Sequence, residues 1–265
     1  MGRLGPVGRV SCFVFVGILL AATFAPLLTP YEPHEQALLE RLLAPSAQHP
    51  LGTDHLGRDL LARLLYGGRF SLLLSMVATV ITALIGLGVA LTAVRFGTWV
   101  DEALMRLVDL FLAFPSFALS LMIAALLKPS FGTLVLAVCV TGWTPYARLA
   151  RAAALETQTK VFVEAARALG GTRNRILIKH LLPSMLSPVL ATVFLRFGHT
   201  LLLVAGLSFL GLGAQPPTAD WGAMLAEARP YMQRSATIML VPGSAIFVTA
   251  LSVTFIGQGL SRVQR

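Results

Sequence analysis

The sequence has few charged residues and only two cysteines, and both shortages restrict its class. Charged residues make up 12% of the 265 residues, whereas a soluble domain carries about 25%. Apolar residues make up 56%, and the mean hydropathy is +0.77. Cys12 and Cys139 both lie within apolar runs, where a thiol packs like any small hydrophobe. The composition therefore excludes an ordinary soluble domain and a disulfide framework, and indicates an integral membrane protein.

Short motifs of the main hydrolase and nucleotide-binding classes are also missing. The sequence contains no HExxH zinc helix, no GxSxG nucleophile elbow and no GxxxxGK[ST] phosphate loop. No lysine follows a glycine anywhere in the chain. We therefore expect that the chain is not an enzyme and binds no cofactor of its own. If ATP drives its function, a partner chain must hydrolyse that ATP.

Long apolar runs are present instead, and their length matches membrane-spanning helices. A helix that crosses about 30 Å of hydrocarbon needs about 20 residues with few charges. None of the runs shows the alternation of period two that marks a membrane barrel. We expect an all-α integral membrane protein with six transmembrane helices. The six runs are residues 10–29, 71–94, 110–128, 129–147, a segment within 181–219, and 235–261.

The basic residues predict the orientation of these helices. If the first residues face the cytoplasm and six helices alternate, both chain ends are cytoplasmic. Seven of the 21 basic residues and seven of the 12 acidic residues then fall outside, which leaves the whole net charge of +9 on the cytoplasmic side. This distribution obeys the positive-inside rule. It explains the pI near 10.5 without a nucleic-acid partner, and none is expected.

A charged island interrupts the apolar runs at residues 164–183, which read EAARALGGTRNRILIKHLLP. Local rules predict two short helices here: Thr159 is a candidate N-cap for a helix over 161–169, and Gly170 with Gly171 is a candidate stop. Thr172 can cap a second helix that Pro183 ends. Spacing alone leaves two interpretations open. The island is either a docking knob for a partner or a basic loop held on anionic membrane lipid.

The same island resembles the EAA loop of binding-protein-dependent ABC importer permeases. The resemblance rests on EAA at 164–166, Gly170, and HLLP at 180–183. The general family pattern has isoleucine where this chain has His180, although HxLP is similar to the peptide and nickel branch. In the family this loop forms the coupling helix that seats in the ATPase subunit. The resemblance therefore implies ATPase-coupling roles for Glu164, Ala165, Ala166, Gly170 and Pro183.

Two further strings resemble the C-type permease subunit of dipeptide, oligopeptide and nickel importers. They are HPLGTDHLGRD at 49–59 and LSFLGLG at 207–213, the latter followed by PPTADWG at 216–222. The resemblance implies the type I ABC importer permease architecture in the cytoplasmic (inner) membrane of a prokaryote. Residues 1–69 would form an N-terminal transmembrane helix plus an extracytoplasmic segment. Residues 70–265 would form the transmembrane domain, with the EAA loop at 157–183.

This family assembles with several partners, which the resemblance implies here as well. They are a homologous B-type permease subunit, two ABC ATPase subunits that use the ATP, and an extracytoplasmic substrate-binding protein. Residues 47–59, 198–206 and 226–231 are more similar to the nickel permease subunit than to the dipeptide one. Residues 213–217 are equally typical of dipeptide permeases. The resemblance thus favours nickel, as an ion or a chelate, with a dipeptide or oligopeptide as the alternative.

Two residues within the fifth apolar run are candidates for the substrate path. Neutral imidazole is a good nickel ligand, so His199 is a candidate metal ligand, although one ligand alone binds weakly. Packing is the alternative role for His199. Arg196 lies three residues earlier on the same helical face and should face protein or water, because exposure to lipid would cost roughly 2.5–3.5 kcal/mol. It could contact a substrate carboxylate or a subunit interface.

The outside segment holds His49, Asp54 and His55 close together in sequence. Such a group can hold a metal ion, but the surrounding glycines and Thr53 are typical of tight turns with side-chain caps. We interpret this segment as ordered loop architecture.

Overall fold

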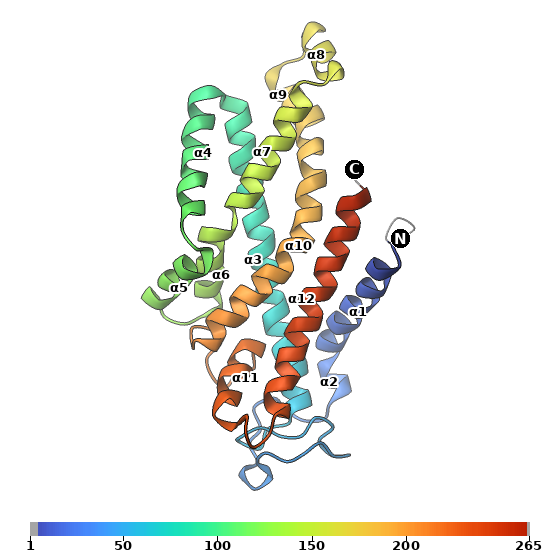
Figure 1. Ribbon diagram of the computed structural model, residues 1–265, viewed down its shortest axis with the longest axis vertical. Helices are drawn as coiled ribbons and strands as arrows, with labels where there is room; N and C mark the ends of the chain where they lie inside the picture. Colours follow the sequence, from blue (N-terminus) through green and yellow to red (C-terminus); the bar gives the residue numbers. More distant parts are fainter. Residues whose placement is uncertain (1–4, 264–265) are drawn as a thin grey trace.

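The computed structural model describes residues 5–263, and most of them are helical (Figure 1). In this part of the chain the only strand-like pairing is an isolated bridge between Thr53 and Asp59. The predicted all-α fold is confirmed.

The N-terminal part contains one candidate membrane helix, a segment over residues 29–59 and one very long helix. We call residues 29–59 the outer segment, after the side on which the sequence predicts them. Its elements are α1 (Pro6–Thr23), α2 (Ala25–Leu28), η1 (Leu38–Glu40) and α3 (Leu60–Phe96). Helix α3 begins where Asp59 Oδ1 accepts a hydrogen bond from the Ala62 N–H at 2.7 Å, and it ends at Gly97, where φ is +83°. Its 37 residues span about 55 Å at 1.5 Å per residue, which exceeds the ~30 Å of a membrane interior.

The predicted third span, residues 110–128, is not one helix. Helix α4 (Thr98–Ala113) ends before Phe114, and α5 (Ser116–Leu126) begins after Pro115 at an angle of 86° to it. Proline lacks an N–H and forces the preceding residue into an extended conformation, so the helix breaks there. The predicted fourth span, residues 129–147, divides at Trp143 into α6 (Phe131–Gly142) and α7 (Thr144–Gln158).

These breaks change the number of candidate spans. Within residues 5–263, four helices are long and apolar enough to cross a membrane, or five if the bent pair α4–α5 counts as one span. The predicted number of six is therefore not confirmed. Helix α6 has only 12 residues, which is too short to cross alone.

The C-terminal part holds the island and two long helices. Its elements are α8 (Val161–Ala168), α9 (Arg173–Ile176), η2 (Leu177–Leu181), α10 (Leu182–Phe209), α11 (Trp221–Ala228), η3 (Arg229–Tyr231) and α12 (Thr237–Val263). Two expectations about the island were wrong. Lys160, not Thr159, is the N-cap of α8, because the Thr159 hydroxyl donates back to the Glu156 carbonyl at 2.8 Å. The helix also does not end at Pro183.

The chain passes through Pro183 because of a π-helical turn. Residues Leu177–Leu181 form this wider turn, and Pro183 then lies in the first turn of α10. A π turn takes up an extra residue and shifts the hydrogen-bond pattern, and the first turn of a helix tolerates proline because its N–H groups lack helical partners. The second island helix is thus continuous with a candidate membrane span.

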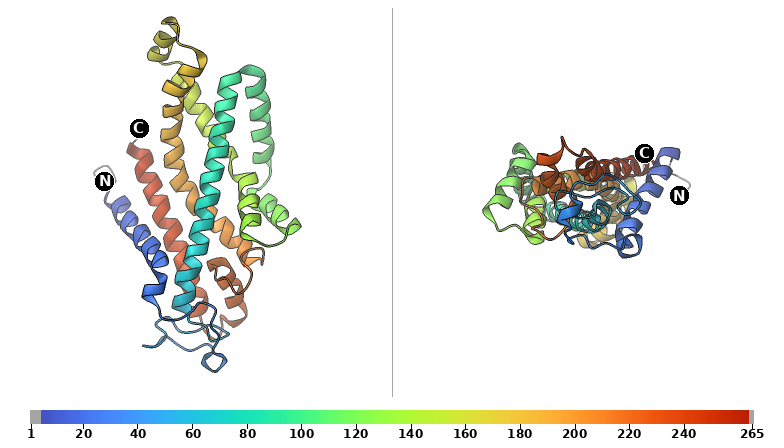
Figure 2. Two further views of the ribbon diagram at one scale, coloured as in Figure 1. Left: turned by 180° about the vertical axis from the view of Figure 1, so that it is seen from behind. Right: turned by 90° about the horizontal axis from the view of Figure 1, so that it is seen from below.

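The long helices pack side by side, with α3 and α10 at the centre (Figure 2). Helices α1 and α12 lie on one flank and α4–α6 on the other. Helices α8 and α9 lie at one end of the molecule, and the outer segment with α11 lies at the opposite end (Figure 1). The two ends therefore form separate surfaces.

Small residues let α7 approach α3 closely. Ala78, Thr82, Gly86 and Ala90 recur every four residues on α3, and all four are buried. An added Cβ on Gly86 would lie 2.5 Å from Tyr146 Cβ and 2.6 Å from the Trp143 carbonyl oxygen. The helix crossing therefore requires glycine at this position.

We predict that Gly86→Ala destabilises the protein by roughly 1–3 kcal/mol, because the added methyl group overpacks the crossing. The measurement is the thermal midpoint of the purified protein in detergent. Gly88→Ala is the matched control, since no atom lies within 4 Å of an added Cβ there and alanine favours a helix. Equal midpoints for the two variants would contradict the prediction.

Candidate functional site

The glycine turn of the island forms the end of α8 in a specific geometry. Gly170 has φ of +81°, its N–H donates to the Arg167 carbonyl at 3.0 Å, and the Gly171 N–H donates to the Ala166 carbonyl at 2.9 Å. These two bonds define a Schellman motif, which favours glycine at the left-handed position. The predicted glycine stop is confirmed. The Thr172 hydroxyl then accepts from the Arg175 N–H at 3.3 Å, so the predicted cap of α9 is also confirmed.

Helix α8 presents an apolar and unusually exposed surface. Val161, Phe162 and Leu169 are 80%, 53% and 89% exposed, whereas Val163 is fully buried and anchors the helix. Glu164 and Ala165 are exposed beside them. A group of exposed apolar side chains of this kind suits a protein partner. The structure thus brings Glu164, Ala165, Ala166 and Gly170 together, while Pro183 lies apart on α10.

A second feature is a cavity of about 200 Å³ that lies between α3, α10 and the shorter helices α4–α7. Arg196 and His199 of α10 both line it, together with Tyr146 of α7, Thr82 of α3 and hydroxyl and aromatic residues of α4–α7. The Arg196 guanidinium lies 6.0 Å from the centre of the Tyr146 ring. Among the described residues it has no acidic partner within 4.0 Å. The cavity therefore contains a guanidinium cation whose N–H groups can donate to a ligand.

Metal binding in this cavity lacks a ligand set. Of the residues that line it, His199 is the only histidine, cysteine or carboxylate, and a divalent transition metal needs several such ligands. Arg196 adds a positive charge that opposes a bare cation. The cavity fits an anionic group better than a free metal ion.

The outer end contains a buried ion network that the sequence did not reveal. Asp54 Oδ2 accepts hydrogen bonds from Arg58 Nε and Arg63 NH1, each at 2.6 Å, and Glu227 Oε2 accepts from Arg63 NH1 at 2.8 Å. Arg58 also donates to Glu227. Asp54, Arg58 and Arg63 are at most 4% exposed. We call these four residues the outer clamp, because they join the outer segment and α3 to α11.

The charges of the outer clamp satisfy one another. Burial alone would raise the pKa of Asp54, but the positive charges of Arg63 and Arg58 outweigh it and hold that pKa below its ordinary 3.8. Burial also opposes ionisation of Glu227, and the hydrogen bonds and charges of Arg63 and Arg58 hold its pKa below 4.5. Both carboxylates are therefore ionised at neutral pH.

The histidines of the outer segment serve this loop architecture. His49 Nδ1 lies 2.9 Å from Asp59 Oδ2, which belongs to the N-cap of α3, and the His49 side chain is buried. Asp54, His55 and Glu227 have ligand atoms within 4.8 Å of one another, but both carboxylates already accept from arginines. The interpretation of the segment as ordered loop agrees with these contacts.

Comparison with known proteins decides the family. Residues 82–264 match the model of the binding-protein-dependent transport system inner membrane component, and residues 6–45 match the N-terminal transmembrane domain of oligopeptide transport permease C. The chain belongs to this family of permeases. It is a permease subunit of an ABC importer. The family is a membrane component of transport systems, which supports transport over an enzymatic activity.

Curated relatives of this permease carry two different substrate names. It is 37% identical over 251 residues to the dipeptide transport system permease protein of Alkalihalophilus pseudofirmus, covering 95% of this chain and 83% of that protein. It is 35% identical over 252 residues to the nickel transport system permease protein of Escherichia coli, covering 95% and 91%. These relatives confirm the peptide and nickel branch and do not distinguish its two substrates.

A solved structure supports the fold of the permease. The methionine ABC transporter in an inward-facing conformation gives a TM-score of 0.59 at 23% identity, covering 77% of this chain and 96% of that one.

We predict that Glu227→Gln weakens the outer clamp and lowers stability by about 2 kcal/mol, because Arg58 and Arg63 lose a charged acceptor. Thermal unfolding in detergent at pH 7 measures this. Glu102→Gln is the matched control: its exposed pair with Arg106 contributes little.

The effect of Glu227→Gln also depends on pH. A carboxyl group whose folded pKa is lowered stabilises the protein above its ordinary pKa, and this contribution disappears as the pH falls. The difference between wild type and Glu227→Gln should therefore be complete above pH 4.5 and shrink below it. A difference that grows toward low pH would contradict the assignment.

Proposed function

We propose that this permease is the C-type subunit of an ATP-driven importer in the cytoplasmic (inner) membrane of a prokaryote, and that its substrates are small molecules bearing a carboxylate. The cavity around Arg196 is the observation that carries the substrate class. The partners are a homologous B-type permease, two ABC ATPase subunits and an extracytoplasmic binding protein. ATP is used by the ATPase subunits.

The distribution of charge supports an orientation with α8 and α9 in the cytoplasm. The end of α7 and the island carry the basic excess, whereas the outer clamp balances its own charges. The start of α1 and the end of α12 point toward the α8 end (Figure 1). Residues 1–4 and 264–265 lie outside the described part, so the cytoplasmic location of the termini is inferred from these helices.

Coupling through α8 supplies the mechanism. ATP binding closes the two ATPases, α8 and its counterpart on the B-type subunit move together, and the path between the permeases opens outward. Hydrolysis resets the path inward. The exposed Val161, Phe162 and Leu169 form the contact with the ATPase, and the Gly170 turn fixes the direction in which the chain leaves it.

The substrate class follows from the charge of the cavity. A guanidinium without an acidic partner binds a carboxylate through charge-assisted hydrogen bonds, and Tyr146 and the neighbouring hydroxyls offer further polar contacts. Short peptides carry such a carboxylate, and so does nickel held by an organic chelator. We propose short peptides as the first candidate substrate.

Nickel chelate is the second candidate, and His199 is the observation that favours it. Its side chain is exposed and lines the same cavity as Arg196, so a chelate could place its carboxylate on Arg196 and its metal near the imidazole. Bare nickel is disfavoured because this chain supplies one ligand beside a fixed positive charge.

We predict that Gly170→Pro abolishes uptake and leaves membrane insertion intact. Proline cannot adopt φ of +81° and removes the N–H that donates to Arg167. Gly170→Ala keeps that N–H and meets no atom within 4 Å, so it should cost only roughly 1–2 kcal/mol and retain partial uptake. Transport assays with quantified membrane levels of each variant measure this. Normal uptake by Gly170→Pro would refute the coupling role.

A second prediction concerns the substrate. Cells with the partner subunits, with and without this chain, are given a labelled dipeptide, nickel with an organic chelator, and nickel alone. We expect chain-dependent uptake of the dipeptide or the chelate, and a roughly 10-fold or greater loss with Arg196→Gln, because a charged hydrogen bond contributes about 1.5–3 kcal/mol.

Two variants separate the outcomes. Arg106→Gln is the control, since Arg106 is an exposed residue paired with Glu102 and should leave uptake unchanged. His199→Ala should lower uptake of the chelate only if the metal contacts the imidazole, and should spare the dipeptide. The carboxylate proposal would be refuted if the cells take up nickel without a chelator and Arg196→Gln leaves that uptake unchanged.

A further inference from the structure

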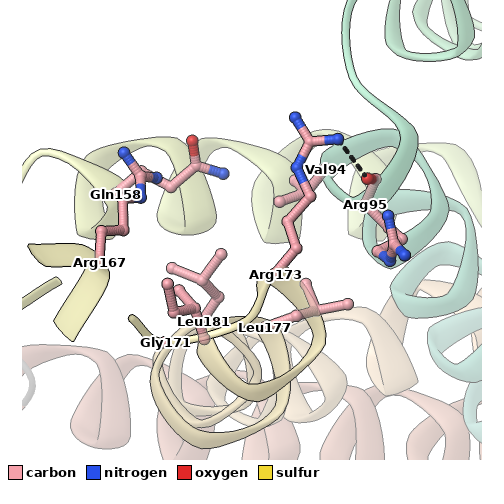
Figure 3. A pocket seen from close by; sticks show the side chains of 9 residues that line it. Val94, Arg95, Gln158, Arg167, Gly171, Arg173, Leu177 and Leu181 are labelled. Carbon is pink, nitrogen blue, oxygen red and sulfur yellow. Dashed lines mark hydrogen bonds between the residues drawn. The ribbon is translucent and has the colours of Figure 1, made fainter. Parts of the chain in front are cut away.

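A pocket of about 460 Å³ lies between the end of α3 and the island (Figure 3). Arg95 comes from α3, Gln158 from the end of α7, Arg167 from α8 and Arg173 from α9. Figure 3 shows Leu181 between Arg167 and Arg173, so apolar side chains form part of the wall. Three arginines from three helices therefore line one open space.

Nothing within the described residues neutralises these three arginines. Arg95 Nε donates to the Asn174 side-chain oxygen at 2.5 Å, and Arg173 NH1 donates to the Arg95 carbonyl at 3.5 Å. Both acceptors are uncharged. Four of the five acidic residues at this end already pair with other basic residues: Asp101 with Arg151, Glu102 with Arg106, Asp109 with Arg148, and Glu156 with Lys160. Among the described residues, no acidic side chain pairs with the arginines of this pocket.

The position of the pocket at the end of the uncharged part of α3 points to the kind of anion that these arginines would bind. Residues 70–94 of α3 carry no charge, and 25 helical residues span about 37 Å, slightly more than the membrane interior. Arg95 follows directly and so marks the end of this uncharged stretch. Phe96 and Trp99 are 63% and 88% exposed beside it. Exposed aromatic residues next to a membrane helix are typical of the interface.

We propose that this pocket binds the phosphate group of an anionic phospholipid from the cytoplasmic leaflet. Arginine suits this ligand because its planar donors match phosphate oxygens. The bound headgroup neutralises Arg95, Arg167 and Arg173 together and ties α9 and the end of α8 to α3. Lipid thus holds the island in position while α8 remains open to its protein partner. This inference is independent of the transported substrate.

The test measures bound lipid on the complete importer complex. Purified complex is equilibrated with phosphatidylglycerol or phosphatidylcholine, and bound lipid is counted by native mass spectrometry. We expect preferential binding of phosphatidylglycerol. Each basic residue near an anionic surface contributes about fivefold in affinity, so Arg95→Gln with Arg173→Gln should lower the affinity for phosphatidylglycerol roughly 25-fold. Arg167 is left unchanged because it belongs to α8.

Matched variants separate a lipid site from a general charge effect or a folding defect. Arg175→Gln removes a charge from the same helix at a residue that does not line the pocket, and should leave lipid binding unchanged. Arg95→Lys with Arg173→Lys keeps the charge and should retain most of the binding. Correct assembly of each complex is checked by its subunit stoichiometry.

Several results would overturn the proposal. Equal binding of the two lipids would exclude an anionic-headgroup site. Unchanged binding in the double glutamine variant would place the lipid elsewhere. Displacement of phosphatidylglycerol by inorganic phosphate at low concentration would indicate a site for a soluble anion. Loss of ATPase subunits from the glutamine variant, with lipid binding unchanged, would show that a partner's carboxylate fills the pocket.

Discussion

A membrane interior offers no partner to a charge or to an unpaired backbone group, and the structure of this permease depends on that constraint. Helix α3 carries no charge from residue 70 to 94, and Arg69 and Arg95 flank this uncharged stretch. At close crossings such as that at Gly86, each helix packs directly against its neighbour. Arg196 of α10 lines a cavity between the helices.

The two ends of the molecule treat charge in opposite ways. At the outer end, Arg58 and Arg63 are buried and form ion pairs with Asp54 and Glu227, so the outer clamp is a closed structural unit. At the other end, Arg95, Arg167 and Arg173 remain without acids around an open pocket. A closed network rigidifies the region around it, whereas accessible charges without acidic partners are available to a ligand. The end that we propose to meet the ATPase is therefore also the end whose charges are open to a ligand.

The sequence predicts features that arise from local rules. Apolar length identifies α1, α3 and α12, and glycine chemistry identifies the turn at Gly170. It fails where the outcome depends on context. Apolar length alone misses the break at Pro115, although proline is known locally to kink or end a helix, and a π turn carries the helix through Pro183. The outer clamp joins Arg63 to Glu227, 164 residues away, so no local pattern reveals it. The coupling and substrate roles stay predictions.

The central claim is that α8 meets the ATPase on the cytoplasmic side. Leu169 is 89% exposed at the end of α8, so a cysteine there, in a chain whose Cys12 and Cys139 are replaced by serine, reports the contact directly. We expect a thiol cross-linker to join Leu169→Cys to an ATPase subunit in intact membranes. A membrane-impermeant thiol reagent added from outside should not label it. Labelling from outside, or a cross-link to the binding protein, would contradict the account.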